Sequence, residues 1–374
     1  MKNYYIGIMS GTSLDGVDAV LCQISSTGKT QVLLHAEVPM DETLRESYFQ
    51  LQTPSDNEIH LEALAANALA HHYHRAIQLI LQRSELQHTD IVAIGAHGQT
   101  IRHQPGLYDG IGYTKQSLNA ALLAEISGIG VIADFRSRDV AAGGQGAPLV
   151  PAFHAAQFMS NTPTTVVNIG GIANLSILPK DSEQAVIGFD TGPGNALMDY
   201  WTMTHLHQAF DEDGAWAASG TVIPQLLESF LSDPYFSKEA PKSTGRDLFN
   251  PTWLNYHLEK NTSTTASPAD VQATLLALTS ISIADHIKTY APDTERVLIC
   301  GGGVKNKALI DSLTTVCPSI SVIASTSSCD IDPQTVEAAA FAWLAWAHKT
   351  KQPANLPAVT GAKGLRILGA IYPA

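Results

Sequence analysis

The stretch TTVVNIGGIANLSIL, residues 164–178, indicates how the rest of the chain is organised. It consists of an apolar run, a glycine-rich turn and a second apolar run, which is the pattern of a β-hairpin. The chain opens on the same plan with YYIGIMSGTSLDGVDAVL, residues 4–21, although the two stretches do not match residue by residue. Two halves that begin with the same hairpin suggest two related lobes.

Strands and helices alternate around these hairpins. Apolar residues recur at helical spacing in residues 61–82, and a second helix is expected over 271–287. Short apolar runs predict strands, and Pro333 precedes a final helical stretch at 335–349. This alternation predicts an α/β fold. We expect an N-terminal lobe over residues 1–155 and a C-terminal lobe over 156–374, with the last helix packing back on the first lobe.

The composition excludes several classes of function. The chain has 374 residues, with 35 acidic and 22 basic side chains and a formal net charge of −13. Nucleic-acid binding needs a basic face, so no nucleic-acid partner is expected, and an anionic membrane surface is disfavoured. The four cysteines form no C-x-x-C pair and no disulfide framework. Without a signal peptide or a long apolar segment, the expectation is a cytoplasmic protein.

Three glycine-rich turns follow predicted strands, at residues 10–18, 168–174 and 301–306. Glycine allows the backbone to approach a ligand closely and to direct successive N–H groups at a phosphate. None of the turns is a Walker loop, and GGGVKN is not the G-x-G-x-x-G of a dinucleotide fold. One such turn is weak evidence, but three at strand ends, two of them in matching places, favour phosphate binding.

The stretch VIGFDTGPGNALMDYW, residues 186–201, places Asp190 at the end of a strand and before a turn rich in glycine and proline. An aspartate in this position is often only a turn former or a helix cap. A carboxylate at a strand end can also serve as a general base. The local sequence alone favours the structural role.

The chain resembles a known family through a series of motifs in order. The three turns together resemble the superfamily of sugar kinases, heat-shock ATPases and actin. More narrowly, the chain is similar to the 1,6-anhydro-N-acetylmuramic acid kinase family through GIMSGTSLDGVD, GAHGQTIRHQP, DFRSRDVAAGGQGAPLVP, NIGGIANLS, GFDTGPGN, KSTGRDLFN, CGGGVKN and LGAIYP. The motifs extend from residue 7 to the C-terminus. The resemblance implies two related actin-like or ribonuclease-H-like lobes of mixed sheets with ATP in the cleft between them.

The resemblance also implies an activity and its residues. Members of the family open the anhydro ring of 1,6-anhydro-N-acetylmuramic acid with water and phosphorylate the freed oxygen with MgATP, in cell-wall recycling. The amino sugar and ATP are the expected partners, and a homodimer is expected. Asp190 would be the base. The ATP-binding residues would be Gly11, Thr12, Ser13, Leu14, Asp15, Gly16, Val17, Asp18, Asn168, Gly170, Gly171, Asn174, Gly301, Gly302 and Gly303.

The sugar of this family carries a lactyl carboxylate, which a guanidinium can bind in a bidentate manner. The segment DFRSRD offers Arg136 and Arg138, and the sequence does not say which of them binds. Both could instead form surface ion pairs. Thr100 and His97 suit sugar hydroxyls or the N-acetyl group, although His97 could be structural. Glu337 could reach a sugar hydroxyl or could only suit the dipole of its helix.

The sequence departs from the wider superfamily at two positions. Met9 and Asn168 stand where aspartates are common in the two hairpins, so Asp190 and Asp15 are the acids best placed by motif. This departure strengthens the assignment of Asp190 as the base and leaves the metal ligands open. Asp15 could equally be a plain turn residue.

Other interpretations stay open at this point. His71, His72 and His74 lack acidic or cysteine partners at metal-ligand spacing, so a solvated helix face is expected there. The chain could be a kinase for an ordinary sugar hydroxyl, or an ATPase of the actin or heat-shock type with a binding function. The role of the loop KSTGRDLFN, residues 242–250, is not apparent from the sequence.

Overall fold

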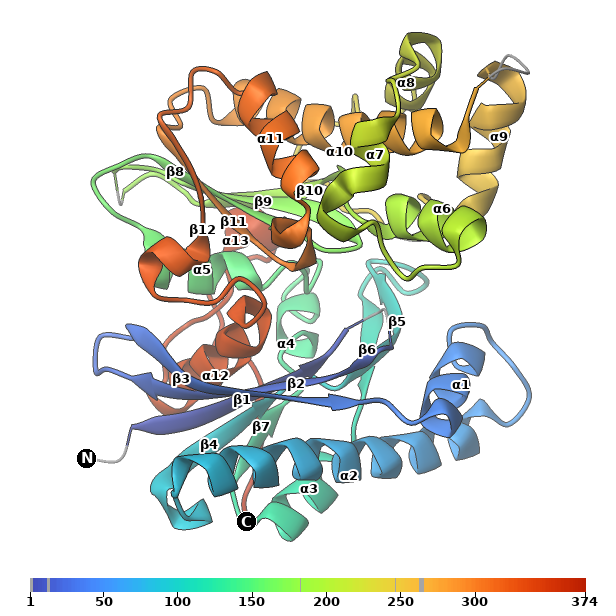
Figure 1. Ribbon diagram of the computed structural model, residues 1–374. Coiled ribbons are helices and arrows are strands. Elements are labelled where there is room, and N and C mark those ends of the chain that lie inside the picture. The colour runs from blue at the N-terminus through green and yellow to red at the C-terminus, as the bar shows by residue number, and fades with distance from the viewer. Residues whose placement is uncertain (1–2, 12–13, 182, 246, 262–265) are drawn as a thin grey trace. The chain divides into compact units, whose positions relative to one another are not determined.

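The computed structural model describes residues 3–11, 14–181, 183–245, 247–261 and 266–374. The chain forms two compact units (Figure 1). Unit 1 comprises Met1–Gln157 and Thr335–Ala374, and unit 2 comprises Phe158–Gln334. The last long helix therefore lies in unit 1, and the segment of the chain that forms unit 2 ends well before the C-terminus.

Unit 1 is built on a six-stranded sheet, a separate two-stranded hairpin and helices. The order in the large sheet is β13-β7-β4-β1-β2-β3, and β5 pairs with β6. The strands are β1 Tyr4–Ser10, β2 Gly16–Ile24, β3 Thr30–Pro39, β4 Ile91–Ala96, β5 Gln99–Pro105, β6 Gly112–Ser117, β7 Val131–Ala133 and β13 Ala370–Tyr372. The helices are α1 Glu42–Gln50, α2 Glu58–Ser84, α3 Ala120–Ser127, α4 Ser137–Val140, α5 Val150–Phe158, α12 Val336–Lys349 and α13 Pro357–Thr360.

Unit 2 contains a five-stranded sheet in the order β10-β9-β8-β11-β12. Its strands are β8 Thr164–Ile169, β9 Ile172–Leu178, β10 Ile187–Pro193, β11 Arg296–Cys300 and β12 Val322–Ser325. Its helices are α6 Ala196–Leu206, α7 Ala215–Ser219, α8 Pro224–Leu231, α9 Pro251–Asn261, α10 Pro268–Tyr290 and α11 Lys307–Val316.

The two units share one strand topology. In unit 1, β1, β2 and β3 form an antiparallel meander, and β4 and β7 extend the sheet parallel to β1. In unit 2, β8, β9 and β10 form the same meander, and β11 and β12 extend the sheet parallel to β8. The prediction of two related α/β lobes with mixed sheets is therefore confirmed.

Glycine determines how α12 packs on the sheet of unit 1. Gly7 of β1 and Gly95 of β4 are paired across the strands. A Cβ atom at Gly7 would lie 1.9 Å from the carbonyl oxygen of Ala338, and one at Gly95 would lie 1.9 Å from that of Phe341. The helix backbone thus rests directly on the two strands, while α2 and α3 cover the opposite face (Figure 1).

We expect Gly95→Ala to destabilise unit 1, because the added methyl group meets a helix carbonyl that side-chain rotation cannot move. Overpacking of this kind costs on the order of 1–3 kcal/mol. The measurement is the denaturant midpoint of the purified variant. Gly130→Ala is the matched control, since a Cβ atom there meets only the carbonyl oxygen of Tyr372 at 3.7 Å. Equal midpoints for the two variants would contradict the packing argument.

The core of unit 2 lies between its sheet and the helices packed on it, chiefly α10 (Figure 1). The helix begins with a capping box, in which the Ser267 hydroxyl accepts from the N–H of Asp270, and Pro268 occupies the first turn. Phe189 and Leu175 from the strands and Leu278 and Ile283 from the helix are fully buried. This packing fixes β10, the strand that carries Asp190.

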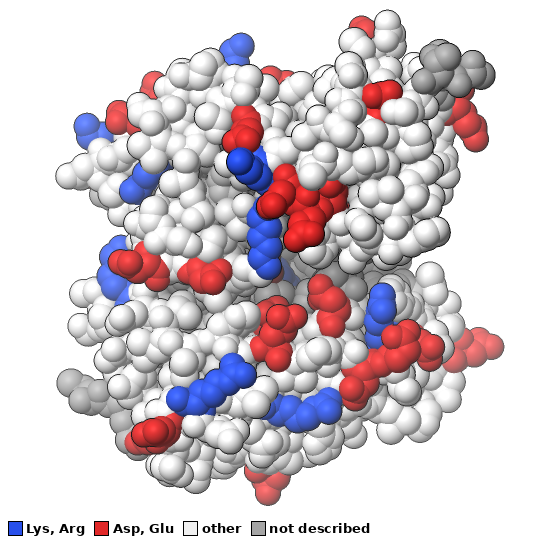
Figure 2. All heavy atoms as spheres, viewed as in Figure 1, with Lys and Arg blue, Asp and Glu red and all other residues white. Residues whose placement is uncertain are grey.

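The charged side chains do not form a basic surface on the face that Figure 2 shows. Lys and Arg side chains are interspersed with Asp and Glu there, and most of that face is uncharged. No helix in the described part of the chain combines the length and the apolar character that a membrane span requires.

Candidate active site

A pocket of about 320 Å³, lined by both polar and apolar residues, lies within unit 1. The end of β1, the β5–β6 hairpin, α12 and the segment before α4 contribute its walls. Thirteen residues line it: Met9, Ser10, Gly11, His97, Gln99, Thr100, His103, Gln116, Arg136, Ala147, Val150, Glu337 and Phe341. The structure therefore brings together four residues that the sequence predicted for sugar binding, namely Thr100, His97, Arg136 and Glu337.

Arg136 is the cation of this pocket. Its Nε and Nη2 atoms lie 3.1 and 2.9 Å from Nε2 of His97, and Nη1 donates to the carbonyl oxygen of Gly146 at 2.9 Å. Burial lowers the pKa of Arg136 to about 10, and nearby Glu337 acts in the opposite direction. The guanidinium is thus held in place and charged at neutral pH.

His97 supports this arginine as a neutral imidazole. Burial, with the charge of Arg136, holds the pKa of His97 well below its usual range. Its ring lies 4.7 Å from that of Phe341, centroid to centroid. Because Nε2 of His97 accepts from the guanidinium, the side chain orients Arg136, which is a structural role within the predicted sugar site.

Arg138 lies elsewhere. Its side chain is exposed and does not line the pocket. The neighbouring Asp139 is fully buried, where its carboxylate accepts hydrogen bonds from the Gly146 N–H at 2.8 Å and from the Asn355 amide and the Thr360 hydroxyl, each at 2.8 Å. Asp139 thus ties the arginine segment to the C-terminal part of unit 1, rather than forming a surface ion pair.

The sequence did not single out two polar residues of the hairpin. Gln116 donates to the Thr100 hydroxyl at 3.2 Å, and Nδ1 of His103 lies 2.9 Å from the Thr114 hydroxyl. Burial, aided by the charge of Arg136, lowers the pKa of His103 to about 4. His103 belongs to GAHGQTIRHQP, but its approach to Thr100 and Arg136 depends on a bulge in β5 that no local pattern indicates.

The first glycine-rich turn, between β1 and β2, is described except for Thr12 and Ser13, which lie outside the described residues. The carbonyl oxygen of Gly11 accepts from the Gln99 amide at 3.2 Å, and the Gly16 N–H donates to the Asp15 carboxylate at 2.9 Å. Gly11 is thereby linked to Gln99, and both residues line the pocket of unit 1.

Three other residues of this turn have side chains that contact the rest of unit 1: Leu14, Val17 and Asp18. Leu14 adopts a left-handed conformation with φ of 57° and is buried in the core with Val17. The Asp18 carboxylate lies 2.8 Å from Nε2 of His35 on β3. Any contact of Leu14 or Val17 with phosphate would therefore come from the backbone.

The second turn, between β8 and β9, lies beside Asp190. Asn168 of β8 pairs with Asn174 of β9, which pairs in turn with Asp190 of β10. Residues directly opposite one another on adjacent strands share one face of a sheet. The structure therefore places two predicted phosphate-loop residues and the predicted base in one row across the sheet.

The backbone of this turn is fixed by the start of α6. The carbonyl oxygens of Gly170 and Gly171 accept from the N–H groups of Asn195 and Gly194 at 2.8 and 2.9 Å. A Cβ atom at Gly170 would meet only the carbonyl oxygen of Ile172, at 3.6 Å. The turn is thus held rigidly from one side and is open at Gly170.

The third turn follows β11 and packs against the second. Gly301 has φ of +81°, and a Cβ atom there would lie 2.4 Å from Oδ1 of Asn168. The chain then enters a short 3-10 helix, Gly302–Lys305. A Cβ atom at Gly302 would meet only the amide of Asn195, at 3.8 Å, so this glycine borders open space.

Among the predicted site residues, Asp190 is an acid whose buried environment shifts its pKa strongly. Its Oδ2 accepts from the N–H of Thr244 at 2.9 Å. Burial raises the pKa of Asp190 to about 7, and the Thr244 N–H acts in the opposite direction. A carboxyl with a pKa close to neutrality can take a proton and give it up at physiological pH, as a general base requires.

The histidines of α2 do not form the solvated face that the sequence predicted. His72 is buried, its Nδ1 lies 3.1 Å from the carbonyl oxygen of Ala68, and its Nε2 lies 3.1 Å from the Asp41 carboxylate. His71 is exposed and His74 is half-buried. No group of three acidic, histidine or cysteine side chains among the described residues could hold a metal ion.

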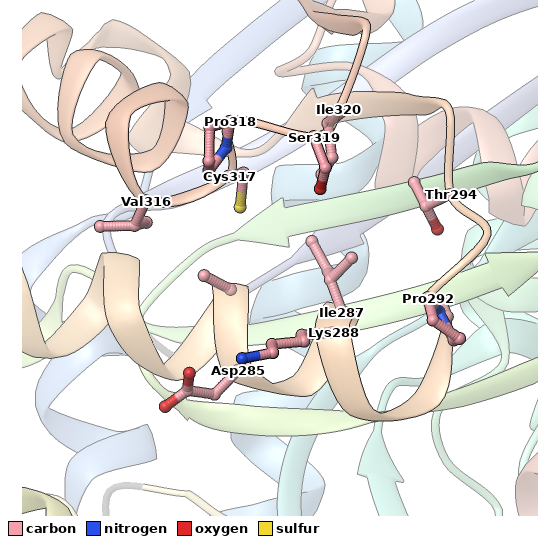
Figure 3. A pocket seen from close by; sticks show the side chains of 12 residues that line it. Asp285, Ile287, Lys288, Pro292, Thr294, Val316, Cys317, Pro318, Ser319 and Ile320 are labelled. Carbon is pink, nitrogen blue, oxygen red and sulfur yellow. The ribbon is translucent and has the colours of Figure 1, made fainter.

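A cavity of about 380 Å³ in unit 2 contains none of the predicted site residues. It lies between the end of α10 and the segments at 292–294 and 316–320 (Figure 3). Among the residues that line this cavity, Cys317 alone carries a thiol. Burial, aided by Asp285, raises the pKa of that thiol, so it stays protonated. This cavity offers no activated nucleophile.

Comparison with known proteins identifies the family. The family model for anhydro-N-acetylmuramic acid kinase matches residues 3–374. The anhydro-N-acetylmuramic acid kinase of Cupriavidus pinatubonensis is 55% identical over 370 residues, covering 99% of this chain and 98% of that protein. That of Ralstonia nicotianae is 53% identical, covering 99% and 97%, and that of Variovorax paradoxus is 52% identical, covering 99% of each. The chain belongs to the anhydro-N-acetylmuramic acid kinase family.

Proposed function

We propose that this protein is an ATP-dependent kinase that opens the 1,6-anhydro ring of 1,6-anhydro-N-acetylmuramic acid and forms N-acetylmuramic acid 6-phosphate in peptidoglycan recycling. The observation that carries the proposal is Asp190, whose pKa is raised to about 7 and which lies in a row with Asn168 and Asn174. Membership in the family provides the substrate class.

Asp190 acts as the base that activates water. Water attacks the anomeric carbon and gives a proton to the Asp190 carboxylate, while the bond from that carbon to the six-position oxygen breaks. The released oxygen keeps the electron pair and attacks the γ-phosphorus of ATP. The bond from that phosphorus to the bridging oxygen breaks, ADP leaves with the electron pair, and the proton on Asp190 returns to solvent.

The pocket of unit 1 binds the sugar. Arg136 pairs with the lactyl carboxylate, because a buried, oriented guanidinium suits bidentate recognition of a carboxylate. Thr100 and Glu337, which line the same pocket, contact sugar hydroxyls or the N-acetyl group. His97 holds Arg136 in position through Nε2.

The glycine-rich turns bind ATP. Gly11, Asp15 and Gly16 contribute from unit 1, and Asn168, Gly170, Gly171 and Asn174 contribute from unit 2. Gly301, Gly302 and Gly303 lie along the adenosine. Mg²⁺ would neutralise phosphate charge. No group of three acidic, histidine or cysteine side chains among the described residues could hold a metal ion, so we expect the ion to be held mainly by phosphates and water, with Asp15 as the nearby carboxylate of the phosphate turn.

We expect Gly302→Ala to raise the KM for ATP by roughly tenfold with no loss of thermal stability. The protein has room for the added methyl group, whose nearest neighbour would be the Asn195 amide at 3.8 Å, so only a bound nucleotide would meet it. A shift of about 1.4 kcal/mol corresponds to that tenfold change. Initial rates against ATP concentration provide the test, and an unchanged KM would remove Gly302 from the nucleotide site.

Two further features follow from the proposed reaction and from the resemblance. A kinase that draws on ATP to recycle wall fragments is expected in the cytoplasm, which fractionation of cells would test. The resemblance implies a homodimer, which sedimentation of the purified protein would test.

The test of the proposed function is a product assay by mass spectrometry. The protein is incubated with MgATP and either 1,6-anhydro-N-acetylmuramic acid or plain N-acetylmuramic acid. The proposal expects the anhydro-sugar to gain both a water molecule and a phosphoryl group. Phosphorylation of only the plain sugar would instead support the ordinary sugar kinase. Hydrolysis of ATP with no sugar product would favour an ATPase.

A further inference from the structure

The loop that begins KSTG, residues 242–245, encloses the backbone of Asp190. The N–H of Asp190 donates to the carbonyl oxygen of Lys242 at 3.1 Å, and the Lys242 ammonium donates to the carbonyl oxygen of Tyr235 at 3.0 Å. The Tyr235 hydroxyl donates to the carbonyl oxygen of Asp190 at 2.7 Å. These three contacts form a closed hydrogen-bonded ring, which we call the Asp190 ring: Asp190, Lys242 and Tyr235.

We infer that Lys242 and Tyr235 are positioning residues for Asp190. The Asp190 ring orients the Thr244 N–H toward the Asp190 carboxylate. This inference rests on the proposed role of Asp190 as the base. The Thr244 N–H lies two residues after Lys242 and donates to Oδ2 at 2.9 Å. The carbonyl oxygen of Lys242 ties the loop to the strand two residues before Thr244, and the ammonium of Lys242 anchors the same residue to the segment of Tyr235, so Lys242 orients that N–H.

The environment of Lys242 supports this role. The side chain is 8% exposed, its ammonium also donates to the carbonyl oxygen of Phe236 at 3.2 Å, and it lies 4.7 Å from the centre of the Tyr235 ring. Burying a charged group is costly unless it is hydrogen-bonded. An apolar residue of similar length would satisfy packing alone, so the lysine points to a need for its hydrogen bonds.

The segment that carries Tyr235 is itself held against β10. Tyr235 is 2% exposed and packs edge-on against Phe249, with ring centroids 5.5 Å apart. A Cβ atom at Gly192, two residues after Asp190, would lie 2.8 Å from the ring of Phe236. The glycine thus lets this aromatic segment approach the strand at the level of the base.

Several titratable groups face this arrangement. Burial raises the pKa of Tyr235, so its hydroxyl keeps its proton. Burial, with the charge of Lys238, lowers the pKa of Lys242 to about 8. From α10, His286 faces Lys242, and burial lowers the pKa of that histidine. Removing the Thr244 hydrogen bond takes away the contact that lowers the pKa of Asp190, so a broken ring raises that pKa further.

The test is the pH dependence of kcat/KM for the anhydro-sugar in Tyr235→Phe and Lys242→Met. We expect the acidic limb, which reports Asp190, to move upward by about one pH unit. We also expect kcat to fall by about tenfold, as for one lost hydrogen bond, with KM nearly unchanged. Because both variants break one ring, the double variant should cost little more than the more damaging single one.

Lys238→Met is the matched control. Lys238 is exposed and also lies over the Tyr235 ring, at 5.7 Å, but it takes no part in the Asp190 ring. This variant removes the same charge from the same segment and should leave the acidic limb in place. If Lys242→Met does not fold, Tyr235→Phe decides alone, since it removes one hydroxyl and no charge.

Two results separate this inference from the proposed function. If Asp190→Asn is inactive while both ring variants keep the wild-type acidic limb, the positioning role is overturned and the base assignment stands. If Asp190→Asn keeps its kcat, the base assignment itself is wrong and the ring has no catalytic group to position. A limb that moves as far in Lys238→Met as in Lys242→Met would also overturn the inference, because charge alone would then explain it.

Discussion

Asp190→Asn is expected to lower kcat for phosphorylation of the anhydro-sugar by roughly 10²–10⁴-fold, the usual contribution of a general base. The amide keeps the shape of the side chain and can still accept from the Thr244 N–H, so the loop should stay in place. It cannot take a proton from water. Steady-state rates at saturating sugar and ATP are the measurement, with Asp311→Asn on the exposed face of α11 as the control.

The pH dependence of the wild-type protein follows from the same residue. Because burial raises the pKa of Asp190 to about 7, kcat/KM should fall as the pH decreases through 7. A pH profile with an acidic limb near 4, the ordinary value for an aspartate, would contradict the assignment.

The stability of the fold should depend on pH in the opposite sense to kcat/KM, decreasing as the pH rises. The folded protein holds the Asp190 proton more tightly than the unfolded chain does. Protonated Asp190 therefore contributes its full stabilisation at pH values below the ordinary aspartate pKa, which is that of the unfolded chain. That contribution is lost as the pH rises through about 7. Asp190→Asn should therefore melt at a higher temperature than the wild type at pH 8, and the difference should disappear near pH 3.

Arg136→Met is expected to raise the KM for the anhydro-sugar by about 10–100-fold, because hydrogen bonds to a charged group contribute about 1.5–3 kcal/mol. The guanidinium is the cation of the pocket in unit 1 and is oriented by His97 and by the carbonyl oxygen of Gly146. The KM for ATP should stay close to the wild-type value. Initial rates against sugar concentration at saturating ATP are the measurement.

The control for this prediction is Arg138→Met, which removes the same charge from an exposed position two residues away. A second comparison uses 1,6-anhydro-N-acetylglucosamine, which lacks the lactyl carboxylate. The wild type should prefer the muramic acid derivative, and Arg136→Met should lose that preference. If Arg138→Met raises the KM and Arg136→Met does not, the carboxylate is bound by the other arginine.

Most of the fold could be predicted from the pattern of apolar residues. The hairpins at 4–21 and 164–178, the helix expected at 61–82 and the final helix all have the expected type. The first strands of the two hairpins and the final helix are apolar runs that are buried along nearly their whole length, and the apolar residues of the helix at 61–82 recur on its buried face. The return of α12 to β1 and β4 depends on Gly7 and Gly95. Only the tertiary structure shows that a helix backbone needs the space at those two glycines.

Less of the site could be predicted from the residues alone. Local sequence favoured a turn role for Asp190, and the motif series reversed that preference. Its pKa depends on burial and on a hydrogen bond from Thr244, a residue 54 positions away. Similarly, Arg136 and Arg138 are equivalent in the sequence, whereas in the structure only Arg136 lines the pocket. The prediction that His72 lies on a solvated helix face is wrong, because its partner, Asp41, comes from a distant part of the chain.

The most direct test of ring opening by water is a reaction in water enriched in oxygen-18, with the product analysed by mass spectrometry before and after removal of the phosphate. The proposed mechanism predicts one labelled oxygen on the anomeric carbon and none in the bond between the sugar and phosphorus, with formation of this product slowed in Asp190→Asn by the same factor as kcat. A phosphorylated sugar that still contains the anhydro ring, or a label located only in the phosphate, would contradict it, because water would not then have opened the ring.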